Sequence, residues 1–361
     1  MIKSFQIDGF RGIRNLSVEH LNRVNLIVGD NNSGKTSVLE ALQLLKNPSQ
    51  LSNLFRVARL RESMFAVSSV ALFENVMCLF PHADELLTLG VSAQLEKKQI
   101  SCSVSGEKNR ILIDAGELND AQERTSEMVG ESEAEQFQGT IVYSNGSKNG
   151  ETPVKINTYT KSTGATTGRE PAIKMAYVSP GDHLRGNIVS QIIRNEGYKE
   201  ICIKALQLFD PEIVDILVLK STVGVRSVDY IKHQTLGLMP LSTFGDGVKK
   251  VLVLANAIAQ ASNGVLFIDE VETAIHKKYY DEIFRFIVKA CAAFKVQAFI
   301  TTHSIEAVDG LLATQNYQEQ TVVDDISVIT VKRANGQTYS RVLTGREVAA
   351  DREAFSFEVR L

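Results

Sequence analysis

The 361-residue chain has only four cysteines, and they lie far apart with no Cys-x-x-Cys pair. A zinc site is therefore not expected, and scattered thiols are typical of a reduced intracellular core. Apolar runs such as VLVLA are far shorter than the roughly 20 residues of a membrane-spanning helix. The net charge of −3 gives no overall basic field, so any contact with nucleic acid needs a local patch. We therefore expect a soluble, cytoplasmic protein that has no membrane partner.

Hydrophobic patterning divides the chain into two kinds of sequence. Residues 1–47 read as strand, turn, strand, loop and helix, and short apolar strands alternate with helices from 177 to 361. This alternation predicts an α/β core with a mainly parallel sheet covered on both faces. Residues 48–176 begin as helical sequence and then change to a period of two with Asn-Gly turns, which predicts a helical insertion and an antiparallel β subdomain.

Finer expectations follow from local composition. The insertion contains strand-like stretches at 92–105, 110–115, 139–144 and 153–160. Residues 114–135 carry eight acids and one arginine, which indicates a solvated loop. Residues 186–217 read as helical with a break at Asp210-Pro211. The C-terminal region predicts a hairpin at 326–344.

A phosphate-binding loop is the first motif that carries chemistry. GDNNSGKT matches G-x-x-x-x-G-K-[ST] in full and stands between an apolar strand and a helix. Glycines allow successive backbone N–H groups to face a phosphate. Lys35 would neutralise the β and γ phosphates and Thr36 would bind Mg²⁺. The motif predicts ATP and Mg²⁺ as cofactors. The expected nucleotide-binding residues are Gly29, Asp30, Asn31, Asn32, Ser33, Gly34, Lys35, Thr36 and Ser37.

Two carboxylates follow the apolar strand at 265–268. The carboxyl ends of strands are where open α/β sheets bind ligands, so Asp269 is expected to join Thr36 as a metal ligand. Glu270 is the candidate catalytic residue that orients and activates the attacking water. The alternative is a pair of acids that cap the next helix. Glu272 and His276 either line a dimer interface or begin that helix.

His303 ends the next apolar strand, in FITTHS. A single histidine in such a place is often structural. Its position one strand beyond the Asp-Glu pair favours a catalytic role as a donor to the γ-phosphate.

A second helix start has the composition of an anion site. LSTFGDGVKK, at 241–250, places hydroxyls and two glycines before a long apolar helix. Hydroxyl and N–H groups at the positive end of a helix suit a phosphate. A capped core helix with flexible glycines is the alternative.

In this order, the four motifs resemble those of the ABC-type ATPases, and within them the SMC-like and overcoming-lysogenisation-defect (OLD) branch. FQIDGFRG at the N-terminus and DEVETAIHKK after the Asp-Glu pair are similar to that branch. The resemblance implies a homodimer in which the 241–250 signature of one chain serves the nucleotide of the other. It also implies nucleotide-binding roles for Ser242 or Thr243, together with Gly245 and Gly247. Arg11 is similar to the basic residue that this branch places near the nucleotide, and a surface salt bridge is the alternative for it.

Other positions depart from the family's pattern. No clear glutamine stands where the family's Q-loop senses nucleotide, and Ser179 and Asp182 are the candidates there. The residues after His303 read as a helix, a hairpin and a tail, so a TOPRIM nuclease domain is not expected. Sustained heptads for a coiled-coil arm are also absent.

The resemblance implies an ATPase switch that controls a separate nuclease or toxin chain in bacterial anti-phage defence. The alternative is a DNA repair or recombination ATPase that binds duplex DNA directly. Its candidate contacts are basic residues that could equally form a charged helix face: Arg56, Arg59, Arg61, Lys97 and Lys98. An assembly module with negligible turnover is a third hypothesis, and Glu270 argues against it.

Overall fold

The computed structural model describes residues 1–61, 71–81, 86–113, 132–160, 170–184, 188–194, 196–220, 227–317, 319, 324–355 and 358–359. None of the helices in these ranges is long and apolar enough to cross a membrane.

A six-stranded sheet forms the centre of the molecule, with the order β15-β14-β3-β13-β12-β8. Its strands are β3 (Val24–Val28), β8 (Met175–Val178), β12 (Val265–Ile268), β13 (Gln297–Thr301), β14 (Ile326–Ala334) and β15 (Gln337–Thr344). All neighbours pair in parallel except β14 and β15, which form the predicted hairpin. The expected α/β core with a mainly parallel sheet is confirmed.

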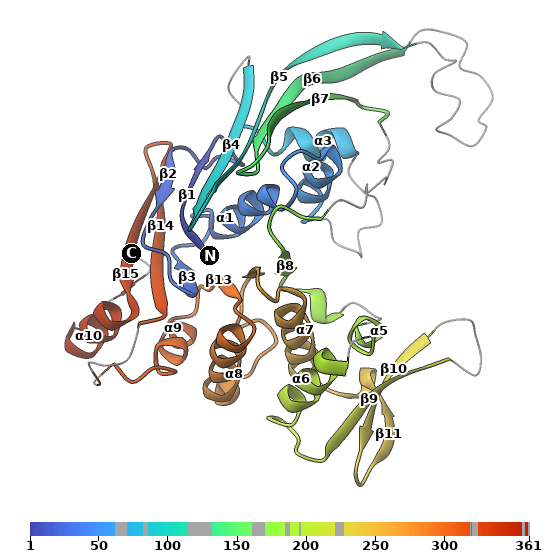
Figure 1. Ribbon diagram of the computed structural model, residues 1–361, viewed down its shortest axis with the longest axis vertical. Helices are drawn as coiled ribbons and strands as arrows, with labels where there is room; N and C mark the ends of the chain where they lie inside the picture. Colours follow the sequence, from blue (N-terminus) through green and yellow to red (C-terminus); the bar gives the residue numbers. More distant parts are fainter. Residues whose placement is uncertain are drawn as a thin grey trace.

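Both faces of this sheet are buried, which explains why its strands read as continuous apolar runs. On β12, Phe267 packs into one core cluster, whereas Leu266 and Ile268 pack into the other. Helices cover the second face (Figure 1). They include α6 (Glu196–Leu206), α7 (Asp246–Gln260), α8 (Tyr280–Ala293) and α9 (Ile305–Leu312), while α10 (Gly345–Phe355) follows the hairpin.

The first face is covered by a second, antiparallel sheet and short helices. The strand order is β2-β1-β4-β5-β6-β7. The strands are β1 (Ile2–Asp8), β2 (Leu16–Val18), β4 (Leu86–Leu95), β5 (Gln99–Ile113), β6 (Ser132–Ser144) and β7 (Asn149–Asn157). Because β1 pairs with β4, the strands of the 48–176 segment extend a sheet that the N-terminus begins. The division into 1–47 with 177–361 and an insertion at 48–176 stays a prediction.

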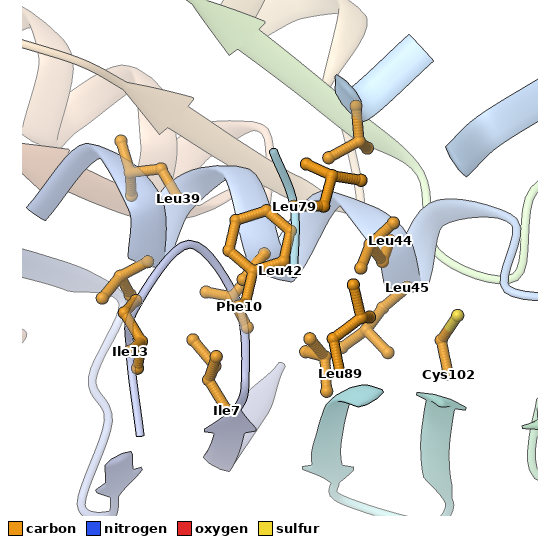
Figure 2. Packing of buried hydrophobic residues seen from close by; sticks show 14 of the residues in the cluster. Ile7, Phe10, Ile13, Leu39, Leu42, Leu44, Leu45, Leu79, Leu89 and Cys102 are labelled. Atoms are coloured by element: carbon orange, nitrogen blue, oxygen red, sulfur yellow. The ribbon is translucent and has the colours of Figure 1, made fainter. Parts of the chain in front are cut away.

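Helix α1 (Lys35–Leu42) lies between the two sheets and continues through η1 (Gln43–Lys46). Figure 2 shows Phe10 and Leu42 within a cluster that joins this helix to the antiparallel sheet. Helices α2 (Leu51–Ala58) and α3 (Leu72–Met77) contribute further buried side chains. The helix that follows the phosphate-binding loop is therefore held by apolar packing on both sides.

Several finer expectations are corrected. Residues 92–105 do not form one strand, because β4 and β5 meet in a turn near Lys97, and β5 runs on through residues 110–113. Residues 132–135 belong to β6, and the rest of the expected acidic loop lies outside the described residues.

The helical prediction for 186–217 is wrong after Pro211. Helices α5 (Val189–Ile192) and α6 are followed by a three-stranded sheet of β9 (Ile213–Lys220), β10 (Ser227–His233) and β11 (Gly237–Pro240). Ile213 and Ile216 of β9 are buried. Their spacing fits a helix as well as an irregularly paired strand, so periodicity alone could not decide.

Candidate nucleotide site

The phosphate-binding loop has the backbone conformation that its glycines predict. Gly29 and Gly34 have φ of 147° and 102°, and Asn32 has φ of 64°. A Cβ at Gly29 would lie 2.3 Å from the Val331 carbonyl oxygen, so that position excludes larger residues. Gly34 caps α1 without any side-chain hydrogen bond. The first amides of α1 are therefore left for an anion such as a phosphate.

Lys35 lies across this loop. Its Nζ donates to the carbonyl oxygens of Gly29 and Asp30, both at 2.8 Å. Burial lowers the pKa of Lys35, and the nearby carboxylates, Glu270 foremost, oppose that shift. The amine is thus placed beside the loop amides, where a phosphate chain would bind.

Asp269 joins the second motif to the first. Its Oδ1 accepts hydrogen bonds from Thr36 Oγ1 at 3.0 Å and from Thr301 Oγ1 at 2.6 Å. Tyr177 donates its hydroxyl to Oδ2 at 3.4 Å, and burial together with Asp269 raises the pKa of that phenol. A hydroxyl and a carboxylate in contact at a phosphate loop are the oxygen ligands that Mg²⁺ prefers. Thr36 and Asp269 would hold the ion, which would neutralise phosphate charge.

Glu270 adopts a left-handed conformation with φ of 48°. This is uncommon for a residue other than glycine and costs of order 1–3 kcal/mol. The Glu270 N–H donates to Thr301 Oγ1 at 2.9 Å, and Thr273 Oγ1 donates to Glu270 Oε2 at 3.3 Å. The side chain stays 41% exposed at the mouth of the pocket, where a carboxylate can reach a water molecule.

Glu272 connects the Asp-Glu loop to His303. Its Oε1 accepts the His303 backbone N–H at 3.0 Å and lies 3.4 Å from the His303 Nδ1. The same Nδ1 is 4.0 Å from Glu270 Oε1, so the histidine lies between two carboxylates. The interface role that is one of the two alternatives for Glu272 stays a prediction, and within its own chain Glu272 makes this contact. His276, left open in the same way, caps the short helix η4 (Lys277–Tyr279) by accepting the Lys278 N–H.

One pocket of about 580 Å³ collects most of the predicted residues. Its walls include the loop residues 31–37, both carboxylates of the Asp-Glu pair, and His303. Sequence reasoning missed several further lining residues. They are Leu60, Arg61, Tyr177, Ser179, Pro180, Gly181, Leu184 and Thr301. The sequence predicts other roles for two of these residues, Ser179 as a candidate for the Q-loop position and Arg61 as a candidate DNA contact.

A second pocket, also of about 580 Å³, lies on the other side of the loop. It shares Asn32, Ser33, Gly34, Ser37 and Arg61 with the first pocket. Arginines give it a basic character: Arg11, Arg14, Arg61 and Arg333. Arg11, expected near the nucleotide, thus lies in this adjoining pocket and not in the one that holds Asp269.

A buried carboxylate on α1 fixes two of these arginines. Glu40 is fully buried and accepts Arg61 Nε and Nη2, both at 2.8 Å, while Arg11 Nε lies 3.1 Å from its Oε2. Arg61 Nη2 also donates to Ser37 Oγ at 3.0 Å. Arg56, in turn, donates to Gln43 Oε1 at 2.9 Å and to Asn53. Two of the five residues proposed for DNA contact therefore have partners within the chain.

The signature segment lies apart from both pockets of its own chain. Leu241–Thr243 form the short helix η3, and Gly245 is the N-cap of α7. Ser242, Thr243 and Gly245 are exposed and are not among the described residues that line either pocket. Thr243 Oγ1 donates to the Pro240 carbonyl at 2.7 Å. A Cβ at Gly247 would lie 3.2 Å from the Ala274 carbonyl oxygen, whereas nothing lies within 4 Å of one at Gly245.

These features agree with a comparison to known proteins. Residues 24–309 match the family described as "AAA domain, putative AbiEii toxin, Type IV TA system". The chain belongs to this family. A relative from Helicobacter pylori named ATP/GTP phosphatase is 23% identical over 358 residues, which cover 89% of this chain and 91% of that protein.

Solved structures show the same fold. An SMC head bound to the C-winged helix domain of ScpA aligns with a TM-score of 0.54 and 12% identity, covering 96% of this chain and 99% of that one. An SMC head with an extended coiled coil, bound to the C-terminal domain of ScpA derived from Pyrococcus furiosus, aligns with a TM-score of 0.50 and 11% identity, covering 99% of each chain. The expected ABC-type ATPase fold is thereby confirmed. Assignment to the OLD branch stays a prediction.

Proposed function

We propose that this member of the AbiEii-type AAA family is a Mg²⁺-dependent ATPase switch that closes as a head-to-tail homodimer. The contact between Thr36 and Asp269 carries the proposal, because it joins a phosphate loop to a metal-binding carboxylate. Glu270 would position and deprotonate the attacking water, and His303, held by Glu272, would donate to the γ-phosphate.

The position of the signature supports sharing of sites between two chains. Ser242, Thr243 and Gly245 are exposed at the start of α7 and do not line the pocket of their own chain. Glu270 and His303 have side chains that are 41% and 50% exposed at the pocket mouth. A second chain that places its signature over this mouth would bury these groups and supply N–H and hydroxyl donors to the γ-phosphate.

The second pocket is the proposed site of the nucleoside. We call it the arginine pocket, because its lining includes Arg11, Arg14, Arg61 and Arg333. The γ-phosphate end of a triphosphate would lie toward Asp269 and His303, so its other end would extend over Ser33 and Gly34 into the second pocket. The Arg333 guanidinium lies beside Gly12, since a Cβ added to Gly12 would lie 3.1 Å from Arg333 Nη2. Guanidinium groups donate hydrogen bonds to ring nitrogens and carbonyl oxygens of a base.

The biological role we propose is control of a separate effector chain in anti-phage defence, as in OLD-like ATPases. The family's description, which names a toxin of a type IV TA system, supports an effector context. Both SMC heads were solved with a second protein bound, which supports a partner chain. A DNA repair ATPase is the alternative, and the internal contacts of Arg56 and Arg61 argue against the five-residue strip suggested for it.

The test is ATP hydrolysis by the purified chain with and without Mg²⁺, duplex DNA and co-purifying proteins. Lys35→Ala should abolish nucleotide binding because it removes the charge beside the β and γ phosphates. Binding of ATP by this variant with the affinity of the wild type would refute the site. Stimulation of hydrolysis by DNA alone would favour the repair function, and stimulation by a co-purifying chain would favour the effector function.

A further inference from the structure

A lysine is completely buried in the signature helix. Lys250 of α7 has an exposed fraction of 0% and is among the largest fully buried side chains. Burial of an ammonium group is unfavourable unless hydrogen bonds and opposite charges compensate it. Its Nζ lies 3.5 Å from the Ser179 carbonyl oxygen, its hydrogen-bond acceptor in the loop after β8.

The groups that face Lys250 come from two parts of the site. Asp182, in η2 (Asp182–Leu184), is the strongest source of favourable charge, and Asp269, Glu272 and Glu270 follow. Burial, and after it the charge of Lys250, lowers the pKa of His183, which lies beside Asp182. Desolvation nevertheless lowers the pKa of Lys250 to about 8.

The loop that Lys250 contacts is also a wall of the nucleotide pocket. Ser179, Pro180, Gly181 and Leu184 line the pocket that contains the phosphate loop. The Ser179 N–H donates to Asp182 Oδ2 at 2.8 Å, so the two residues hold the loop in one conformation. A single amine therefore bonds the helix that begins with the signature to a wall of the pocket, and the charge of Asp269 acts on that amine.

We propose that Lys250 is a positioning residue that couples occupation of the nucleotide pocket to the position of the signature helix α7. A nucleotide and a metal ion that enter the pocket would change the electric field at the Lys250 ammonium group. They would also contact the loop whose Ser179 carbonyl accepts a hydrogen bond from Lys250. Because Lys250 is an interior residue of α7, a displacement of that loop is passed to the whole helix and to Gly245 at its start. The inference rests on the proposed function only in that the displaced helix end faces the second chain.

The sign of the pH effect follows from the burial. Below pH 8 the amine is charged and attracted to the carboxylates, so the link is present. Above pH 8 it loses its proton, and the link weakens. The fold itself should not suffer from this deprotonation, because burial favours the neutral amine over the charged one. An arginine at this position would keep its charge throughout this range.

Hydrogen exchange of the α7 amides, with and without ATP and Mg²⁺, measures the coupling directly. Three variants are compared with the wild type: Lys250→Met, Lys250→Arg and, as the control on an exposed face, Lys204→Met. The wild type and Lys204→Met should show ATP-dependent protection of α7, and Lys250→Met should lose it. Lys250→Met should still bind a fluorescent ATP analogue, because Lys250 is not among the described residues that line the nucleotide pocket. Protection in the wild type should also fall between pH 7 and 9, and Lys250→Arg should retain it.

Dimerisation in a Glu270→Gln background then separates this inference from the proposed dimer. Adding Lys250→Met should weaken ATP-dependent dimerisation by about 5–150-fold, the range of ordinary coupling between sites. If Glu270→Gln stays monomeric while the exchange results hold, the dimer is wrong and the coupling stands. Retention of α7 protection in Lys250→Met, or its absence from the wild type, would overturn the coupling. A low melting temperature combined with lost ATP binding in both Lys250 variants would also overturn it, because the lysine would then be only structural.

Discussion

Shared sites predict that two inactive variants restore each other. Gly245→Trp places a bulky side chain at the start of α7, and Lys35→Ala removes the phosphate charge. Gly245 has φ of −63° and open space around its Cβ position, so the tryptophan should not strain its own chain. Replacing an N-cap glycine costs at most about 1 kcal/mol, against a typical stability of about 5–15 kcal/mol. Gly245→Trp should therefore fold and bind ATP, yet fail to close the dimer.

The expected rescue can be counted. A mixed dimer has one composite site with both lesions and one with neither, so it should show about half of wild-type activity if the sites are independent. Random exchange in an equal mixture makes half of the dimers mixed, which gives roughly a quarter of wild-type activity overall. Strong coupling between the two sites would lower both values.

The assay is phosphate release from the separate variants and from their mixture after subunit exchange. Gly247→Ala is the contrasting variant, because its Cβ would lie 3.2 Å from the Ala274 carbonyl oxygen of the same chain, which would have to shift by a few tenths of an ångström. ATP-dependent dimerisation of Glu270→Gln, measured by light scattering, is the control. A mixture no more active than its components, in a chain whose Glu270→Gln form dimerises, would mean that the signature acts within one chain. A Glu270→Gln form that stays monomeric with saturating ATP and Mg²⁺ would refute the dimer.

Three further substitutions test the pocket itself. Glu270→Gln should keep nucleotide binding and lower turnover by about 10²–10⁴, because it removes the base beside the attacking water; normal turnover would place the base elsewhere. Glu272→Gln weakens the acceptor that holds His303. The kcat should therefore fall and the pH–rate profile should shift, while the Kd for ATP stays the same. An unchanged pH–rate profile would contradict this role of Glu272. Arg333→Ala should weaken nucleotide binding by about tenfold, because it removes a hydrogen bond from a charged group. The control Lys332→Ala, which changes the adjacent exposed residue, should leave nucleotide binding unchanged. Equal effects of the two substitutions would show that the nucleoside does not bind in the arginine pocket.

The parts of the site that the sequence predicts are those built by local chain geometry. The phosphate loop needs Gly29 and Gly34 at positive φ, and both occur within one strand–loop–helix unit. Asp269 follows β12, and the continuous apolar sequence of that strand predicts that the strand is buried. Because parallel strands end at one edge of the sheet, the fold class predicts that Thr36 and Asp269 lie at the same edge, where β13 separates the strands that precede them.

The parts that the sequence does not predict depend on contacts between distant segments. Arg56 and Arg61 resemble a basic patch until their acceptors, Gln43 and the buried Glu40, are known. Periodicity places Glu40 on the helix after the phosphate loop. It does not show that Arg61, in the turn after Ala58, lies against Glu40. Such a carboxylate has no distinguishing pattern in sequence, so the charge pattern alone could not show that these two arginines have acceptors within the chain.

The two signature glycines show the same limit at a single site. In sequence they are equivalent, two small residues before an apolar helix. In the structure, a side chain at Gly247 would press on the Ala274 carbonyl oxygen of its own chain, whereas a Cβ at Gly245 would meet no atom within 4 Å. A glycine that its own fold does not require is the one whose conformational freedom can serve a second molecule. Gly245, and not Gly247, is therefore the position at which the shared-site mechanism should be tested.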